Sequence, residues 1–335
     1  MKKIKINHLD LFSGIGGFHL GFEKAGFEVN SYFSEVDKYA IDVYKNNFKN
    51  SNYVGSVTDV RGTQLPKIDA ITFGSPCQDF SLAGKRKGMG GQRSSLITEA
   101  IRLIDECRPR FFVWENVKGT FSSNNGEDFW AIIQAFTNLG GYRLEWQLLN
   151  TKWFLPQNRE RIYLVGYLGD GSGGQVFPIG ENDSTLKNKF RKKDRSISKT
   201  ENKNIHARTI GIGTAKMATD STFIKVKSAT AKGYEEAVEG DSINYSNPNS
   251  KTRRGRVGKG VAQTLDTTCN QAVIDNKIRR LTPIECERLQ GFSDNWTEYG
   301  ESGKISDTQR YKMCGNAVTV DVVEAVAKNI IKVIK

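Results

Sequence analysis

The sequence predicts an α/β fold: a doubly wound, mostly parallel sheet joined to a second, smaller and irregular domain that contains β-structure. Over residues 1–170, short apolar runs of strand character alternate with helical stretches, which is typical of a parallel sheet with helices on both faces. Beyond the glycine-rich stretch at 169–174 the composition shifts to Lys, Asn, Ser, Thr and Gly, with short β-like runs. We therefore expect domains at 1–170 and 171–276, and a return to the first domain at 277–335.

The first predicted strand, residues 4–12, runs into a tight turn that contains Gly14, Gly16 and Gly17. Glycine takes backbone angles that other residues avoid and lets a ligand approach the chain closely. A strand, a glycine turn and a helix in this order begin a nucleotide-type binding unit. The dinucleotide spacing requires a third glycine where His19 stands. A nucleoside cofactor without phosphates, such as S-adenosylmethionine, therefore fits better than NAD.

The helix after this turn carries Phe18 and Phe22 at inward spacing and ends at Gly26. A second strand at 29–33 leads to Glu35. A carboxylate at the end of the second strand can accept hydrogen bonds from both ribose hydroxyls. Glu35 alone is equally explained as a solvated helix cap, but with the glycine turn at this spacing it indicates a cofactor pocket.

A short apolar strand, residues 70–73, leads to Pro76 and Cys77. Ligands of α/β proteins bind at the carboxyl ends of the strands, and a cysteine thiolate is a strong nucleophile. The alternative is a small buried hydrophobic residue, which is the usual role of a free cysteine.

Two further segments place charged residues beside buried strands. The apolar run 111–114 is followed by Glu115. An unpaired buried carboxylate is costly and needs a partner or a task, and the alternative is a helix cap. Arg159 and Arg161 alternate on an extended segment before the next strand, so both point to one face. That face suits a phosphate or a carbonyl oxygen, although a surface charge pair with Glu160 is a common alternative.

The C-terminal region has clear helical signals. Thr282, Pro283 and Glu285 form a helix start, with Thr as the cap, Pro in the first turn and Glu at the third position. A last helix at 318–334 has the apolar spacing of a helix that packs on a sheet.

The charge balance favours a polyanionic partner. Lys and Arg number 49 against 37 Asp and Glu, a net charge of +12 over 335 residues. Basic residues concentrate at 187–203 and 251–259. Either run can contact phosphate or be a solvated linker.

The five cysteines include no C-x-x-C pair, so we expect no metal. Free cysteines suit a reducing cytosol. The first residues lack the apolar core of a signal peptide, and no stretch approaches a membrane span. We expect a cytoplasmic protein of the bacterial cytosol with no membrane association.

Taken in order, these segments resemble the cytosine-C5 DNA methyltransferases. The resemblance is carried by the glycine turn at 12–17, Glu35, Pro76-Cys77-Gln78, Glu115-Asn116-Val117, Gln157-x-Arg159-x-Arg161, the segment 280–292 and Gly315-Asn316-Ala317-Val318. Only about 100 residues, between 171 and 275, lie outside it. The resemblance implies a Rossmann-like methyltransferase sheet with a target-recognition domain.

The resemblance also implies a mechanism. Cys77 would add to C6 of a cytosine, and C5 would then take a methyl group from a sulfonium before loss of the C5 proton releases the thiolate. Glu115 would protonate or hydrogen-bond ring N3, Arg161 would bind the base O2, and Arg159 would orient Glu115 or a backbone phosphate. The target base must leave the duplex, at a cost of a few kcal/mol.

The cofactor implied is S-adenosylmethionine, with S-adenosylhomocysteine as the product. The residues carried over to its pocket are Phe12, Gly14, Gly16, Gly17, Glu35, Val36, Ser56, Pro76, Asn316 and Val318. At the third strand many relatives have Gly-Asp-Ile, whereas this chain has Gly55-Ser56-Val57. Either Ser56 or Asp59 can therefore take the adenine amino group.

The partner implied is double-stranded DNA. Residues 81–94, rich in glycine and basic side chains, would form a lid that closes on DNA, and the alternative is a flexible solvated loop. The DNA contacts carried over are Gln78, Ser81, Lys85, Arg86, Arg93 and Thr264. We expect a monomer that can have a cognate restriction endonuclease acting independently.

Three other functions account for part of this pattern. They are the same chemistry on transfer RNA, a catalytically silent DNA-binding regulator, and a nicotinamide dehydrogenase. The basic insert favours DNA over transfer RNA. The presence of Cys77, Glu115 and Arg161 together argues against a silent regulator, and the broken glycine spacing disfavours a dehydrogenase.

Overall fold

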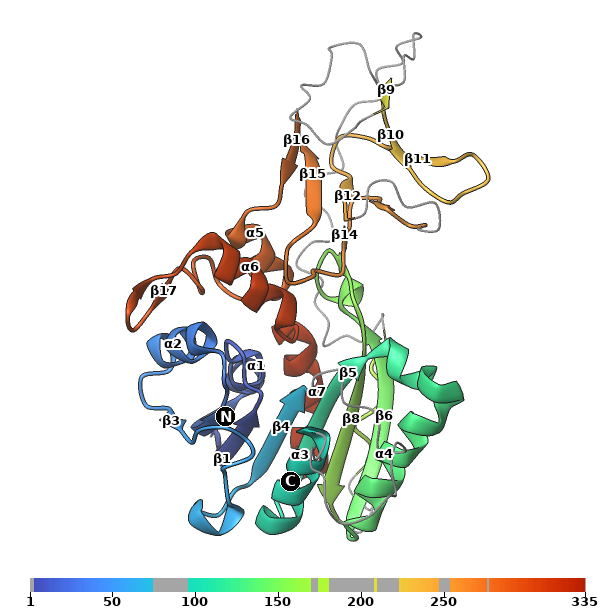
Figure 1. Ribbon diagram of the computed structural model, residues 1–335. Coiled ribbons are helices and arrows are strands. Elements are labelled where there is room, and N and C mark those ends of the chain that lie inside the picture. The colour runs from blue at the N-terminus through green and yellow to red at the C-terminus, as the bar shows by residue number, and fades with distance from the viewer. Residues whose placement is uncertain are drawn as a thin grey trace, which may run out of the picture.

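The computed structural model describes residues 3–74, 96–169, 174–180, 223–246, 254–275 and 277–334, together with the backbone of residues 208–209. Figure 1 shows a large sheet with helices around it and a group of small sheets above it. Among the described residues, no helix has the length and apolar character needed to cross a bilayer.

The large sheet has seven strands in the order β3-β2-β1-β4-β5-β8-β6. The first five of these pair in parallel, whereas β8 runs antiparallel to both β5 and β6. The prediction of a mostly parallel α/β sheet is confirmed. The strands are β1 (Ile4–Leu11), β2 (Phe27–Ser34), β3 (Asn52–Tyr53), β4 (Ala70–Gly74), β5 (Phe111–Val117), β6 (Tyr142–Asn150) and β8 (Glu160–Leu168).

Helices cover both faces of this sheet. The α-helices are α1 (Gly17–Ala25), α2 (Lys38–Asn47), α3 (Leu96–Cys107), α4 (Glu127–Asn138), α5 (Pro283–Leu289), α6 (Asp307–Asn316) and α7 (Val320–Val333). Short 3-10 turns lie at η1 (Gly62–Gln64), η3 (Lys118–Phe121), η4 (Ser123–Gly126) and η5 (Thr151–Trp153). Helix α1 begins after the glycine turn and ends at Gly26, whose φ of 108° only glycine adopts readily.

Strand β5 shows how the sheet is buried on both sides. Phe111 and Val113 lie in the core that α1 and α7 cover, and Phe112 and Trp114 lie in the core that α3 and α4 cover. Successive side chains of a strand point to opposite faces, so a strand between two helical layers must be apolar at every position. This explains the unbroken apolar run before Glu115.

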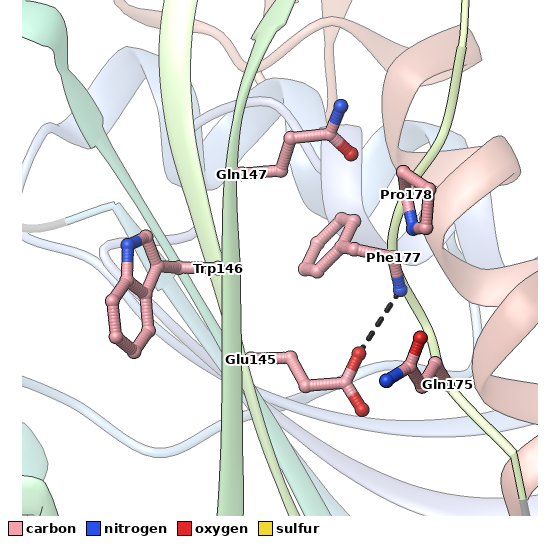
Figure 2. A pocket seen from close by; sticks show the side chains of 6 residues that line it. All are labelled: Glu145, Trp146, Gln147, Gln175, Phe177 and Pro178. Atoms are coloured by element: carbon pink, nitrogen blue, oxygen red, sulfur yellow. Dashed lines mark hydrogen bonds between the residues drawn. The ribbon is translucent and has the colours of Figure 1, made fainter.

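Residues 174–180 lie over one face of the sheet at β6, on the side that α7 covers. Oε2 of Glu145 accepts hydrogen bonds from the backbone N–H of Val176 at 2.9 Å and of Phe177 at 3.1 Å. Figure 2 shows Glu145 and Gln147 pointing toward this segment, while Trp146 points the other way. Gln147 binds the backbone of Ile179 in both directions, as donor at 2.9 Å and as acceptor at 2.8 Å.

The remaining strands form small sheets, as predicted for a small β-containing unit. They are β9 (Arg208–Thr209), β10 (Ile224–Lys227), β11 (Tyr234–Ala237), β12 (Ser242–Asn244), β13 (Val257–Gly258), β15 (Gln271–Asp275) and β16 (Lys277–Arg280). Strand β14 (Ala262–Gln263) pairs in parallel with β7 (Gln157–Asn158), and β17 (Tyr299–Gly300) pairs with β18 (Gly303–Lys304). Strand β16 pairs with β15, so the chain leaves the small sheets through a hairpin.

Helix α5 begins as its sequence predicts. Thr282 and Glu285 form a capping box, with Pro283 in the first turn. Both carboxylate oxygens of Glu285 also accept hydrogen bonds from Arg279 at 2.9 Å. These hydrogen bonds outweigh the effect of burial and lower the pKa of Glu285 from 4.5 to about 2.

This ion pair predicts a pH-dependent stability. Because the folded-state pKa of Glu285 is depressed, its contribution is fully present above about pH 4.5 and is lost as pH falls toward 2. Glu285→Gln keeps the capping box, since Gln also serves there. We expect the free energy of unfolding to fall by about 1–2 kcal/mol at pH 7, allowing for solvent screening. Urea unfolding measured from pH 7 to pH 3 should show the free energies of unfolding of the wild type and of Glu285→Gln approaching each other.

A matched control is Glu324→Gln, which removes an ion pair with Lys328 on the surface of α7. Pairs of this kind contribute about 0.3–0.5 kcal/mol. An equal stability loss for Glu285→Gln at pH 7 and pH 3 would contradict the assignment.

Candidate active site

The glycine turn after β1 is tied to the end of β2 by Glu35. Its carboxylate accepts hydrogen bonds from the backbone N–H of Gly14 at 2.9 Å, of Val36 at 2.7 Å and of Asp37 at 2.9 Å. Gly14 and Gly16 have φ of 53° and 85°. Because an ionised carboxylate has about four acceptor positions, Glu35 keeps capacity for a further donor such as a ribose hydroxyl.

Apolar surface lies beside this carboxylate. Val36 is 76% exposed, although large apolar side chains are usually buried. Phe12 is half-buried and has a φ of 52°. Ser56 bonds to Thr58 at 2.9 Å, and Asp59 is exposed beside the same threonine. Both candidates for the adenine contact thus lie in the same turn.

The segment after α6 reaches the glycine turn from the C-terminal part of the chain. A Cβ atom on Gly17 would lie only 2.6 Å from Cγ2 of Val318, so this close approach requires glycine. Val318 also lies 4.0 Å from the corresponding position on Gly74. Asn316, the last residue of α6, is exposed. The predicted cofactor residues Gly17 and Val318 are therefore neighbours.

Glu115 and Arg161 meet across β5 and β8. Nε of Arg161 lies 3.1 Å from Oε1 of Glu115, and the Glu115 residue is only 8% exposed. Nη1 of Arg161 also donates to the backbone oxygen of Glu160 at 2.8 Å. Burial, with the neighbouring Glu115 charge, raises the pKa of Tyr163. Since β5 continues to Val117, Glu115 is a strand residue and the helix-cap alternative is wrong.

Gly74 makes room for this pair. It lies opposite Glu115 in the register of β4 and β5, and a Cβ atom on Gly74 would be 3.2 Å from Oε2 of Glu115. Gly74 was not among the site residues predicted from the sequence. A glycine at the end of a buried strand, just before a candidate nucleophile, is the signal that would have identified it.

Arg159 is placed differently from Arg161. It is 3% exposed, and its guanidinium donates to the backbone oxygen of Ala317 at 2.9 Å and, at longer range, to those of Gly315 at 3.4 Å and Leu265 at 3.5 Å. The resemblance implied that Arg159 orients either Glu115 or a backbone phosphate. The guanidinium seen to ion-pair with Glu115 is that of Arg161. Arg159 joins backbone segments behind the pair.

Several predicted site residues lie outside the described part of the chain. These are Pro76, Cys77, Gln78, Ser81, Lys85, Arg86 and Arg93. Thr264 is described, and its hydroxyl donates to the backbone oxygen of Asn158 at 2.8 Å. In the described ranges, no three His, Cys, Asp or Glu side chains are grouped to hold a metal ion.

Comparison with known proteins identifies the family. The family model for C-5 cytosine-specific DNA methylases matches residues 6–332. The chain belongs to this family. Its activity is accordingly that of a DNA (cytosine-5-)-methyltransferase, and the resemblance seen in the sequence is confirmed.

Curated relatives agree with the family. The Type II methyltransferase M1.ScrFI of Lactococcus lactis subsp. cremoris is 32% identical over 335 residues, which cover 100% of this chain and 80% of that protein. The Type II methyltransferase M.Bsp6I of Bacillus sp. strain RFL6 is 30% identical, with coverage of 96% and 97%.

Solved structures show the same fold. A DNA modification methyltransferase encoded within an E. coli prophage matches with a TM-score of 0.60 and 21% identity, covering 98% of this chain and 99% of that one. The S. pombe Dnmt2 methyltransferase matches with a TM-score of 0.58 and 16% identity, covering 98% of both chains.

Gly74→Ala tests the geometry around Glu115. The added methyl group would press on Oε2 of Glu115 and displace the carboxylate from Arg161. Displacing a catalytic group by a fraction of an ångström to an ångström can cost a factor of about 10–100 in rate. We expect DNA methylation, measured as tritiated methyl transfer, to fall by about that factor with little change in Tm.

Gly180→Ala is the control, because no atom of the described residues lies within 4 Å of a Cβ atom there. Equal activities of the two variants would show that Glu115 tolerates the displacement.

Proposed function

We propose that this protein transfers a methyl group from S-adenosylmethionine to carbon 5 of a cytosine in a specific short sequence of duplex DNA, by covalent addition of Cys77 to C6. The observation that carries this proposal is the buried Glu115–Arg161 pair at 3.1 Å. It stands beside Gly74, the last described residue before Cys77. An acid paired with a cation at this place suits a reaction in which charge develops on a heterocycle.

The chemistry assigns a separate task to each side chain. The Cys77 thiolate forms a bond to C6, and electron density moves from the C5–C6 double bond to C5. Glu115 in its protonated form donates a proton or hydrogen bond to N3, and the Arg161 guanidinium holds O2. After C5 has been methylated, a base removes the C5 proton, the S–C6 bond breaks to release the Cys77 thiolate, and the C5–C6 double bond re-forms. A proton taken up at N3 returns to Glu115. Arg159 supports the site through the backbone oxygens that it holds.

The cofactor residues form one pocket in this proposal. S-adenosylmethionine supplies an electrophilic methyl group on a sulfonium and leaves as S-adenosylhomocysteine. Glu35 would accept from the ribose hydroxyls, and Phe12 and Val36 would contact the adenine. Ser56 or Asp59 would take the amino group. The methionine end would lie between the glycine turn, which contains Gly14, Gly16 and Gly17, and the residues that close the pocket. Those residues would be Pro76, Asn316 and Val318.

The fit of this cofactor rests on features of the chain itself. Val36 is exposed beside the Glu35 carboxylate. Three of the roughly four acceptor positions of that carboxylate are used by backbone N–H groups, which leaves about one for a hydroxyl donor. At Gly14 no atom of the described residues lies within 4 Å of where a Cβ would stand, so the backbone there leaves room for a close ligand.

The DNA would lie between the catalytic part, 1–170 with 277–335, and the recognition domain, 171–276. Thr264 and the segment containing Gln78, Ser81, Lys85, Arg86 and Arg93 would contact it, and at least one of the basic runs 187–203 and 251–259 would bind phosphate. The target cytosine would be flipped out of the duplex. We further propose that the enzyme acts as a monomer in the cytoplasm, with a cognate restriction endonuclease that acts independently.

The experiment that tests this function measures tritiated methyl transfer to unmethylated plasmid DNA and, in parallel, to transfer RNA. We expect incorporation into DNA at 5-methylcytosine, located by bisulfite sequencing, and none into transfer RNA. Incorporation into transfer RNA alone would overturn the proposed substrate.

The covalent step has its own test. A duplex that carries 5-fluorocytosine at the target position should trap a protein–DNA adduct, because the fluorine cannot leave as the C5 proton does. The adduct should survive denaturing electrophoresis and require S-adenosylmethionine. Cys77→Ser should form no adduct and should lose about 10³-fold or more in rate, as expected for loss of a nucleophile. Full activity of Cys77→Ser would rule out this mechanism.

A further inference from the structure

Gln157 joins two segments that are far apart in the sequence. It is fully buried in β7. Its Nε2 donates to the backbone oxygen of Leu289, at the end of α5, at 2.8 Å. Its Oε1 accepts from the backbone N–H of Leu265 at 3.0 Å. The Gln157 side-chain amide therefore binds both Leu265, which follows β14, and Leu289, the last residue of α5.

Gln290 continues this connection toward the cofactor side. It is also fully buried, and its Oε1 lies 3.4 Å from Nε2 of Gln157. Its own Nε2 donates to the backbone oxygen of Cys314 at 2.8 Å, and its Oε1 accepts from the hydroxyl of Thr319 at 3.0 Å. Cys314 and Thr319 flank Gly315-Asn316-Ala317-Val318, so Gln290 holds both ends of that segment.

The side-chain amides of Gln157 and Gln290 bind the same two segments that Arg159 contacts, or residues next to them. Arg159 donates to Leu265, Gly315 and Ala317, and Gln157 and Gln290 fix the residues on either side. Asp266 is in close contact as well, since a Cβ atom on Gly315 would lie 2.5 Å from its backbone oxygen. A shift of the Leu265–Asp266 segment would therefore be transmitted to Gly315 by contact.

We propose that Gln157 and Gln290 are positioning residues that hold the DNA-reading segment at Thr264–Leu265 and the cofactor-closing segment at 315–318 in one fixed arrangement around Arg159. Because each amide must keep both of its partners, a ligand that orders one segment also orders the other. Binding of DNA and of the cofactor then reinforce each other by the same factor in both directions. The inference rests on the proposed function, which assigns the two segments to DNA and to the cofactor.

Gln157→Met tests the proposal, with Gln147→Met as the matched control. Methionine has a similar length and no amide, so each variant loses a two-way clamp on distant backbone. Gln147 clamps Ile179 beside β6, outside the site described above. The measurement is the Kd for S-adenosylhomocysteine by calorimetry, with and without unmethylated plasmid DNA. Tm is recorded for every variant.

For the wild-type protein we expect DNA to tighten S-adenosylhomocysteine binding by about fivefold or more. Gln157→Met should bring this factor close to one, while Gln147→Met should keep the wild-type factor at a similar loss in Tm. A merely structural role for Gln157 would lower Tm and leave the factor unchanged, and that result would overturn the proposal. A wild-type factor of one would overturn it too.

If Gln157→Met does not fold, Thr319→Val is the second variant that tests the proposal. It removes one hydroxyl between Gln290 and Thr151 with almost no change in shape. The factor by which DNA tightens S-adenosylhomocysteine binding should fall below that of the wild type. An unchanged factor would count against the proposal. If the wild-type protein neither binds S-adenosylhomocysteine nor methylates DNA, the proposed function itself fails. If it does both and the variants match their controls, only this inference fails.

Discussion

The burial of the Arg159 guanidinium is the constraint on which the site depends. A buried charge is costly unless it is surrounded by acceptors, and the acceptors here are backbone oxygens of Leu265, Gly315 and Ala317. These belong to the end of the small sheets and to the segment between α6 and α7. Arg159, which lies between β7 and β8, therefore has these acceptors only when both distant parts of the chain are in place.

Three glycines permit the close approach of these parts. A side chain on Gly17 would meet Val318, one on Gly74 would meet Glu115, and one on Gly315 would meet the backbone of Asp266. In each case a segment distant in sequence occupies the space that a Cβ atom would fill. Glycine thus lets three segments approach their neighbours closely: the glycine turn, the end of β4 and the end of α6. The polar groups of the site lie beside these close contacts.

Local patterns were sufficient to predict much of this arrangement. The strand 111–114, the turn at Gly14 and Gly16, and the capping box of α5 each depend on residues close in sequence, and all appear as expected. The antiparallel placement of β8 was not predicted, because pairing is decided by tertiary contacts. The same register places Arg161, and not Arg159, against Glu115. The roles of Gln157 and Gln290 depend on partners more than 100 residues away or on the turn between α6 and α7, which no local pattern specifies.

Directional polar contacts also explain how a small, irregular unit can be held precisely on a large sheet. Apolar contact alone would tolerate sliding, because it is non-directional. The β14–β7 pairing is only two residues long on each strand, which is too short to fix a register firmly. The Gln157 amide makes the register specific. If Leu265 moved by one residue, a buried amide oxygen and a buried N–H would lose their partners, at a cost of about 1–3 kcal/mol each. The register of the Thr264–Leu265 segment against β7 is therefore set by hydrogen bonds rather than by the extent of the interface.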